Sequence, residues 1–206
     1  MRLTPSKIVC VGKNYRDHAA EMGGDVPAAP LLFLKPPSAI IADGEAIVMP
    51  RASARVDHEG EIGLVVGRTL RGASVAEARA GIQSIVAAND VTARDLQKVD
   101  GQWTRAKGFD TFCPVGAPGA VPADLDGMEL ITRVNGQARQ RARASDMVFS
   151  IPELLAYASN VMTLFAGDLV LTGTPSGISP LAEGDVVEIE IVGVSRVRSP
   201  VVAQRQ

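Results

Sequence analysis

Three acidic residues stand where two predicted strands begin or end. Glu59 and Glu61 open the apolar run 62–66, and Asp90 closes a second apolar run over 84–88. Residues two apart on a strand project from the same face, so Glu59 and Glu61 should point the same way. If the two strands are neighbours, three carboxylates converge, and their repulsion favours either a bound proton or a cation between them.

This set of oxygen ligands, with no Cys or His, suits a hard divalent ion such as Mg²⁺, Mn²⁺ or Ca²⁺. The same spacing also fits Glu59 and Glu61 on the solvent side of a half-buried strand. Spacing alone leaves both interpretations open. His58 is not counted as a ligand, because strand alternation points it away from both glutamates.

A second candidate pair is His18 and Glu21, three residues apart on a predicted short helix. A carboxylate bonded to one ring nitrogen would make the other nitrogen a general base for water. An ordinary surface pair on an amphipathic turn is the alternative interpretation. The segment 14–24, with Asn14 as predicted N-cap and glycines at its end, precedes a proline-rich loop, which favours a mobile lid.

Hydrogen-bond donors follow Asp90 closely. Arg94, Gln97 and Lys107 could hold the remaining oxygens of an anionic substrate that chelates the ion, although each alone is also typical of solvated surface. The turn at 171–177 offers backbone N–H groups and the Thr174 hydroxyl for a carboxylate, although a plain turn has the same composition. Trp103 is expected to pack rather than to bind.

Composition excludes several classes of function. A net charge of −2 over 206 residues argues against nucleic-acid binding, and no apolar stretch approaches the length of a membrane span. Cys10 and Cys113 are too few and too scattered for a disulfide framework, so a reducing cytoplasm is expected. Twenty Gly, thirteen Pro and 4% aromatics favour short strands joined by tight turns.

Local patterns place the main elements. We expect a strand at 7–11, a buried apolar run at 31–34 and a hairpin around Asn135-Gly136. Capping boxes at Ser74 and Ser150 predict helices that end near 81 and 162. Together these patterns favour one β-rich domain over 1–206 with a few short helices, a mainly β member of the α+β class.

The motifs closely resemble those of the fumarylacetoacetate hydrolase family, and the match runs from residue 7 to the end of the chain. It rests on the stretches around His18 and Glu21, Phe33-Leu34-Lys35-Pro36, His58-Glu59-Gly60-Glu61, 88–97, 103–110, Val134-Asn135-Gly136 and Thr172-Gly173-Thr174-Pro175-x-Gly177. The chain starts directly at the first motif. In this respect the sequence is similar to the compact branch of the family, which includes acylpyruvases and oxaloacetate decarboxylases.

The resemblance implies a mixed β-sandwich roll that forms a homodimer and acts on a small 2-oxo acid. It implies Mg²⁺ or Mn²⁺ at the three carboxylates, with Ca²⁺ as an in-vitro substitute. It also implies that the substrate-binding and catalytic groups surround the chelated substrate and that the short helix closes as a lid. Those groups would be Arg94, Gln97, Thr174, His18, Glu21 and Lys107, whereas Lys13 receives no role.

The function expected from this sequence is hydrolysis of an acylpyruvate, with oxaloacetate decarboxylase activity beside it. In this hypothesis the ion acts as a Lewis acid, His18 activates water, and Lys107 adds positive charge near the enolate oxygen. One alternative is a decarboxylase or isomerase of 2-oxo-heptenedioate-type diacids. An alternative of another class is a non-catalytic, metal-stabilised domain that binds carboxylates.

Overall fold

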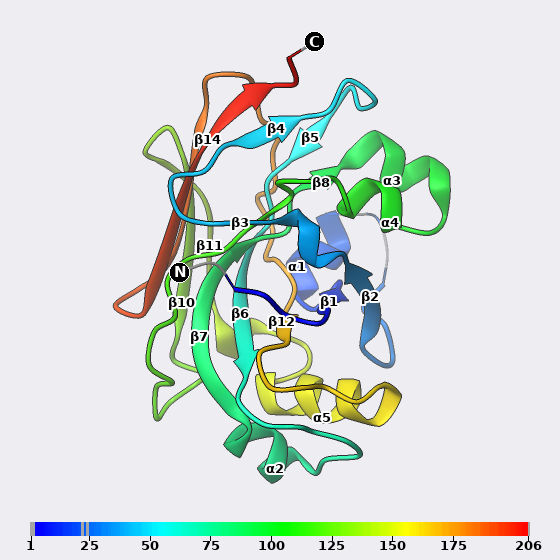
Figure 1. Cartoon of the computed structure of the whole chain (residues 1–206), viewed down its shortest axis with the longest axis vertical. Coiled ribbons are helices and arrows are strands. Elements are labelled where there is room, and N and C mark those ends of the chain that lie inside the picture. Colours follow the sequence, from blue (N-terminus) through cyan, green and yellow to red (C-terminus); the bar gives the residue numbers. More distant parts are fainter. Residues whose placement is uncertain (1–2, 22, 24, 206) are drawn as a thin grey trace.

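The computed structural model describes residues 3–21, 23 and 25–205, and it confirms the mixed α+β class with mostly short helices (Figure 1). The helices are α1 (Arg16–Glu21), α2 (Val75–Ala80), α3 (Arg94–Asp100), α4 (Thr104–Lys107) and α5 (Ile151–Val161), with 3₁₀ turns at Pro37–Ala39 and Ala144–Asp146. Among the described residues, no helix has the length and apolar character needed to cross a bilayer.

Two five-stranded sheets form the framework. The first has the order β2-β1-β12-β6-β7, and the second has the order β11-β10-β13-β14-β4. The first comprises β1 (Ile8–Gly12), β2 (Leu31–Lys35), β6 (Gly60–Val66), β7 (Ile82–Asn89) and β12 (Leu169–Leu171). The second comprises β4 (Ile47–Met49), β10 (Glu129–Val134), β11 (Gln137–Arg143), β13 (Val186–Ile191) and β14 (Ser195–Ala203). Two small ladders pair β3 (Ile40–Ile41) with β9 (Cys113–Pro114) and β5 (Val56–Asp57) with β8 (Thr92–Ala93).

The main core lies between the two large sheets. From β6, Ile62, Leu64 and Val66 face this core, and residues of β10, β13 and β14 pack into it from the second sheet. The other face of the first sheet buries Val65 in a smaller cluster that also contains Val86. Because β6 is covered on both faces, its sequence is a continuous apolar run rather than an alternating one.

Several expected elements are confirmed. The capping boxes at Ser74 and Ser150 are present and begin α2 and α5. The hairpin of β10 and β11 turns at Asn135 and Gly136, which both have positive φ angles, as a tight hairpin turn requires.

Two expectations about local structure are wrong, and two helices were missed. The apolar run before Lys35 is half exposed, with Leu31 at 40% and Leu34 at 47%, because β2 is the outermost strand of its sheet. The buried residue of this strand is Lys35. Asn14 does not cap α1, which begins two residues later. Helices α3 and α4 were not predicted, because neither has a side-chain N-cap.

Asn14 instead ties three loops together beside helix α1. Its side-chain nitrogen donates to the carbonyl oxygens of Thr172 (2.9 Å) and Phe149 (3.2 Å), and its side-chain oxygen accepts from the Phe149 amide (2.9 Å). The residue is fully buried. The loop after β1, the turn after β12 and the approach to α5 are therefore held in one arrangement. The lid segment predicted at 14–24 falls partly outside the described residues.

Replacing Asn14 by Ala should lower the free energy of unfolding by about 2–4 kcal/mol, because buried amide and carbonyl groups lose their partners. Chemical denaturation followed by circular dichroism measures this change. Asn160→Ala is the matched control, since Asn160 is exposed and, among the described residues, its side chain bonds only to its own helix. This change should alter stability by less than about 0.5 kcal/mol. A loss of stability for Asn14→Ala that is no larger than the loss for the control would contradict this role of Asn14.

Candidate metal and substrate site

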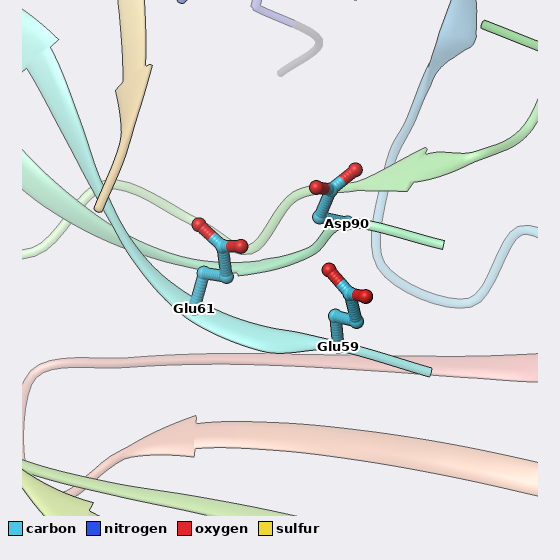
Figure 2. Close-up of side chains that lie close together, drawn as sticks. All are labelled: Glu59, Glu61 and Asp90. Atoms are coloured by element: carbon cyan, nitrogen blue, oxygen red, sulfur yellow. The ribbon is translucent and has the colours of Figure 1, made fainter. Parts of the chain in front are cut away.

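The three predicted carboxylates converge. Glu59, Glu61 and Asp90 are all buried, and one oxygen from each lies within 4.8 Å of the others. Figure 2 shows the three side chains projecting to the same side of the β6 and β7 ribbons. The alternative that placed the glutamates on a solvent-facing side of a strand is therefore wrong.

Strand pairing explains this convergence. β6 and β7 are antiparallel, with Glu61 opposite Ala88, so the start of one strand lies beside the end of the other. Side chains alternate along β6, so Glu61 lies on the face of Val65, away from the second sheet. Gly60 faces the second sheet, where an added Cβ would lie 2.0 Å from the Thr132 hydroxyl oxygen. A glycine is thus required between the two glutamates.

Buried cations neutralise two of the carboxylates completely. The Lys107 ammonium lies 2.7 Å from both Glu59 Oε2 and Asp90 Oδ2. The other Asp90 oxygen accepts from Lys35 at 2.7 Å, and the other Glu59 oxygen accepts from Arg94. Each of these four oxygens therefore has a cationic partner, which offsets the cost of burying the charges.

Glu61 is held differently. Its Oε2 accepts a hydrogen bond from the Gly173 amide at 2.7 Å, and no cationic group of the described residues pairs with it. The turn at 171–177 therefore does hold a carboxylate, as expected, but it is one of the protein's own. Gly173 has a φ of +96°, and a Cβ there would lie 2.9 Å from that of Asn14.

These environments separate the pKa values of the two glutamates. Burial alone would raise the pKa of Glu59, but Lys107 and Arg94 outweigh it and hold that pKa below its ordinary value. Burial raises the pKa of Glu61 well above its ordinary value, and the neighbouring Asp90 and Glu59 charges raise it further. Glu61 is therefore the carboxylate of the cluster that most favours a proton when no other cation is present.

The cluster fits a hard divalent ion. Bonds of about 2.0–2.6 Å place two ligands of one ion at most about 4–5 Å apart, and the three oxygens meet that limit. Each carboxylate oxygen has more than one lone pair, so an oxygen that accepts from Lys107 can also face an ion. The ion could be held by Glu59, Glu61 and Asp90.

The predicted pair on α1 also forms. His18 Nδ1 lies 3.1 Å from Glu21 Oε2, and the His18 residue is only 5% exposed. Because a carboxylate accepts, this nitrogen carries the proton in the neutral imidazole, and in that form Nε2 has a lone pair. The other Glu21 oxygen accepts from the Gly177 amide at 3.1 Å, so α1 is attached to the turn after β12.

A cavity of about 200 Å³ joins these groups. Every candidate except Glu21 lines it; those lining residues are His18, Glu59, Glu61, Asp90, Arg94, Gln97, Lys107 and Thr174. Arg94 and Gln97 lie one turn apart on α3, and Arg94 donates to the Gln97 side-chain oxygen at 2.6 Å. The Gln97 amide nitrogen is thus left for a ligand.

Several residues around the site were missed or misjudged from the sequence. Lys35 has no feature that distinguishes it from a surface lysine at the end of an apolar run, yet it bonds Asp90. Trp103 was expected only to pack; it does pack edge-on against Phe33, with ring centroids 5.2 Å apart, and it also lines the cavity. Lys13, which received no role, lines it too. His58 does point away from the cluster, toward Gln140, as alternation predicted.

The fold and this site define a β-sandwich enzyme with a carboxylate cluster at the ends of two strands. The family model for fumarylacetoacetate (FAA) hydrolase, C-terminal, matches residues 7–202, and the chain belongs to this family of enzymes. The resemblance inferred from the motifs is therefore confirmed.

Relatives with named activities support this assignment. The mitochondrial oxaloacetate tautomerase FAHD1 of Arabidopsis thaliana is 42% identical and covers 94% of this chain and 89% of its own. The mitochondrial oxaloacetate decarboxylase of Dictyostelium discoideum is 40% identical, covering 93% and 91%. Among solved structures, a 2-hydroxyhepta-2,4-diene-1,7-dioate isomerase from Mycobacterium marinum has a TM-score of 0.91 at 45% identity, covering 99% and 77%.

The raised pKa of Glu61 predicts that ion binding releases a proton. A ligand carboxylate must lose its proton to bind the ion, so affinity for Mg²⁺ or Mn²⁺ should increase as the pH rises through that pKa. Calorimetric titration in two buffers with different heats of ionisation counts the protons released.

Glu61→Gln should bind the ion weakly and release no proton, whereas Glu183→Gln, at an exposed position, should behave as the wild type. Affinity that is independent of pH, with identical heats in both buffers, would contradict the assignment.

Proposed function

We propose that this protein is a divalent-metal-dependent enzyme that forms the enolate of a 2-oxo acid during decarboxylation, tautomerisation or isomerisation. One observation carries the proposal: the buried cluster of Glu59, Glu61 and Asp90 opens into a cavity that also exposes His18 and Lys107. The activities named for the relatives all pass through such an enolate or enol, which supports this choice.

The cluster's charge favours an anionic substrate. Three carboxylates are matched by three buried cations, Lys35, Arg94 and Lys107, so a divalent ion would leave an excess of positive charge. When bound, Mg²⁺ or Mn²⁺ would supply a Lewis acid to the 2-oxo group and its neighbouring carboxylate. That excess positive charge would stabilise both the bound 2-oxo acid anion and the negative charge that develops on its 2-oxo oxygen.

The chain's own side chains position the substrate. The Lys107 ammonium lies beside the place where the enolate charge develops. Arg94, the free amide nitrogen of Gln97 and the Thr174 hydroxyl line the same cavity as donors for the substrate carboxylate. All of these groups are buried or half-buried, so water competes little for their hydrogen bonds.

His18 is the proposed base. Its Nε2 lone pair can take a proton from the carbon next to the 2-oxo group and return it to another atom, which is the chemistry of a tautomerase or an isomerase. Glu21 holds the ring in the required tautomer. Decarboxylation needs no such base, because the electrons come from the bond to the departing CO₂.

Hydrolysis of an acylpyruvate is the second candidate. The same His18 could activate water for attack on the 4-oxo carbon, and pyruvate would then leave as its enolate. The His18–Glu21 pair could serve either candidate, whereas the relatives' named activities favour the first. A single catalytic domain over 1–206, the cytoplasmic location and the homodimer stay predictions.

A substrate panel with His18→Ala tests both candidates. Oxaloacetate, acetylpyruvate and fumarylpyruvate are assayed with Mg²⁺ and Mn²⁺ and ranked by kcat/KM. The variant should lose about 10²–10⁴-fold of tautomerisation and of any hydrolysis, because both need the base. Its oxaloacetate decarboxylation should stay within about tenfold of the wild type, as expected for a step with no base. Equal losses in all reactions would remove the assigned role of His18.

A further inference from the structure

The cavity has a charged end that the proposed chemistry does not use. Glu59, Glu61 and Asp90 form its buried end, whereas Lys13 is half-buried and Lys98 is exposed, so these two lysines lie toward the mouth. Phe33 and Trp103 line the cavity as well. The cavity therefore combines a buried cluster of carboxylates that could hold a metal ion, aromatic walls and a cationic mouth.

Neither of the two lysines at the cavity mouth is paired with another group in the described part of the protein. Lys35, Arg94 and Lys107 each pair with carboxylates, but across the described part of the chain Lys13 and Lys98 have no hydrogen bond or ion pair. Three ammonium donors on each lysine are thus available to a ligand.

The backbone directs both lysines to the cavity. Lys13 has a φ of +56°, a left-handed conformation that is rare outside glycine, and it directly precedes the fully buried Asn14. Lys98 is four residues after Arg94 on α3, so the two share a helix face. A strained backbone at Lys13 persists only where its surroundings hold it in place.

We propose that Lys13 and Lys98 determine substrate specificity in this chain by forming a subsite for a second carboxylate of the substrate. This inference rests on the proposed function, in which the 2-oxo carboxylate end occupies the Glu59–Glu61–Asp90 cluster. The two ammonium groups bind the distal carboxylate, and the aromatic side chains contact the carbon chain between the two ends.

Two unreactive ligands of equal chain length test the subsite. 2-Oxoglutarate and 2-oxopentanoate differ only by a distal carboxylate in place of a methyl group, and their binding to the Mg²⁺-loaded protein is measured by calorimetry. The wild type should bind the diacid about tenfold more tightly, as expected for charge-assisted hydrogen bonds. The double variant Lys13→Met/Lys98→Met should remove that preference and leave the binding of 2-oxopentanoate and oxalate unchanged. The control variant Arg71→Met should leave the binding of both ligands unchanged.

The outcomes separate the two proposals. Equal affinity of the wild type for both ligands, or an unchanged preference in the double variant, would overturn the subsite. Failure of both ligands and of oxalate to bind in a Mg²⁺-dependent manner would instead overturn the proposed function and, with it, the subsite.

A second inference rests on a different part of the site, the contact between the second sheet and Thr174. Gln140, on β11, is 1% exposed and reaches across to the cavity wall. Its side-chain oxygen accepts from the Gly60 amide (3.0 Å) and lies 3.2 Å from His58 Nδ1. Its side-chain nitrogen donates to Thr174 Oγ1 (2.7 Å) and to the Pro175 carbonyl oxygen (2.8 Å).

These partners determine the direction of every bond. The Gly60 amide can only donate, so the Gln140 oxygen must face it and the nitrogen must face Thr174. The Thr174 oxygen therefore accepts from Gln140 and must direct its own proton elsewhere. In the structure this proton goes to the Gly60 carbonyl oxygen at 2.9 Å, while Thr174 also lines the cavity.

We infer that Gln140 is a positioning residue that makes Thr174 a donor toward the substrate. When a substrate carboxylate enters, the Thr174 proton can turn to it, because the Gln140 amide keeps the hydroxyl's acceptor side occupied. Gln140 itself does not line the cavity and acts through Thr174.

A double-mutant cycle tests this inference. Thr174→Val and Gln140→Met should each raise KM about tenfold with a smaller change in kcat, and the double variant should resemble Thr174→Val alone. Thr174→Ser keeps the hydroxyl and should stay near the wild type. A Gln140→Met effect on KM that persists in the Thr174→Val background would overturn the positioning role.

Gln140→Glu is a second variant that tests the same inference if Gln140→Met does not fold. It keeps the oxygen that faces the Gly60 amide and replaces the nitrogen that donates to Thr174 and to the Pro175 carbonyl, so it should raise KM in the same way. A KM for Gln140→Glu equal to that of the wild type would contradict the inference.

Discussion

The structure depends on the pairing of two buried carboxylates, Glu59 and Asp90, with three buried cations. An unpaired charge at such depth would cost several kcal/mol, so Lys35, Arg94 and Lys107 must all be in place. They come from β2, α3 and α4, which are distinct elements of the chain. The charges thus orient the short helices beside the sheet, where few apolar contacts are available to do so.

The acidic residues at the site were predictable because they follow the simplest rule of strand geometry. Glu59 and Glu61 are two apart, and Asp90 follows the neighbouring strand, so alternation and antiparallel pairing place all three together. The capping boxes of α2 and α5 and the Asn135-Gly136 hairpin were predictable for a similar reason, since each depends on residues close in sequence.

The rest depends on partners that are distant in sequence. Lys35 contacts Asp90 across 55 residues, and Gln140 contacts Gly60 across 80, so no local pattern marks either one. Leu31 and Leu34 look like core residues, but whether a strand lies at the edge of a sheet is a property of the whole topology. Helix α3 lacks a side-chain cap because its N-cap residue, Ala93, has no polar side chain, and Arg94 at its start binds the distant Asp57 and Glu59.

The position of β12 has a consequence for biosynthesis. This strand comes late in the chain yet lies between β1 and β6, so the two halves of the first sheet cannot join before it emerges from the ribosome. Until then the nascent chain carries Glu59, Glu61 and Asp90 without the Gly173 amide. A truncated translation product that ends before β12 would therefore hold the acidic cluster on an unfinished sheet and lack a working cavity.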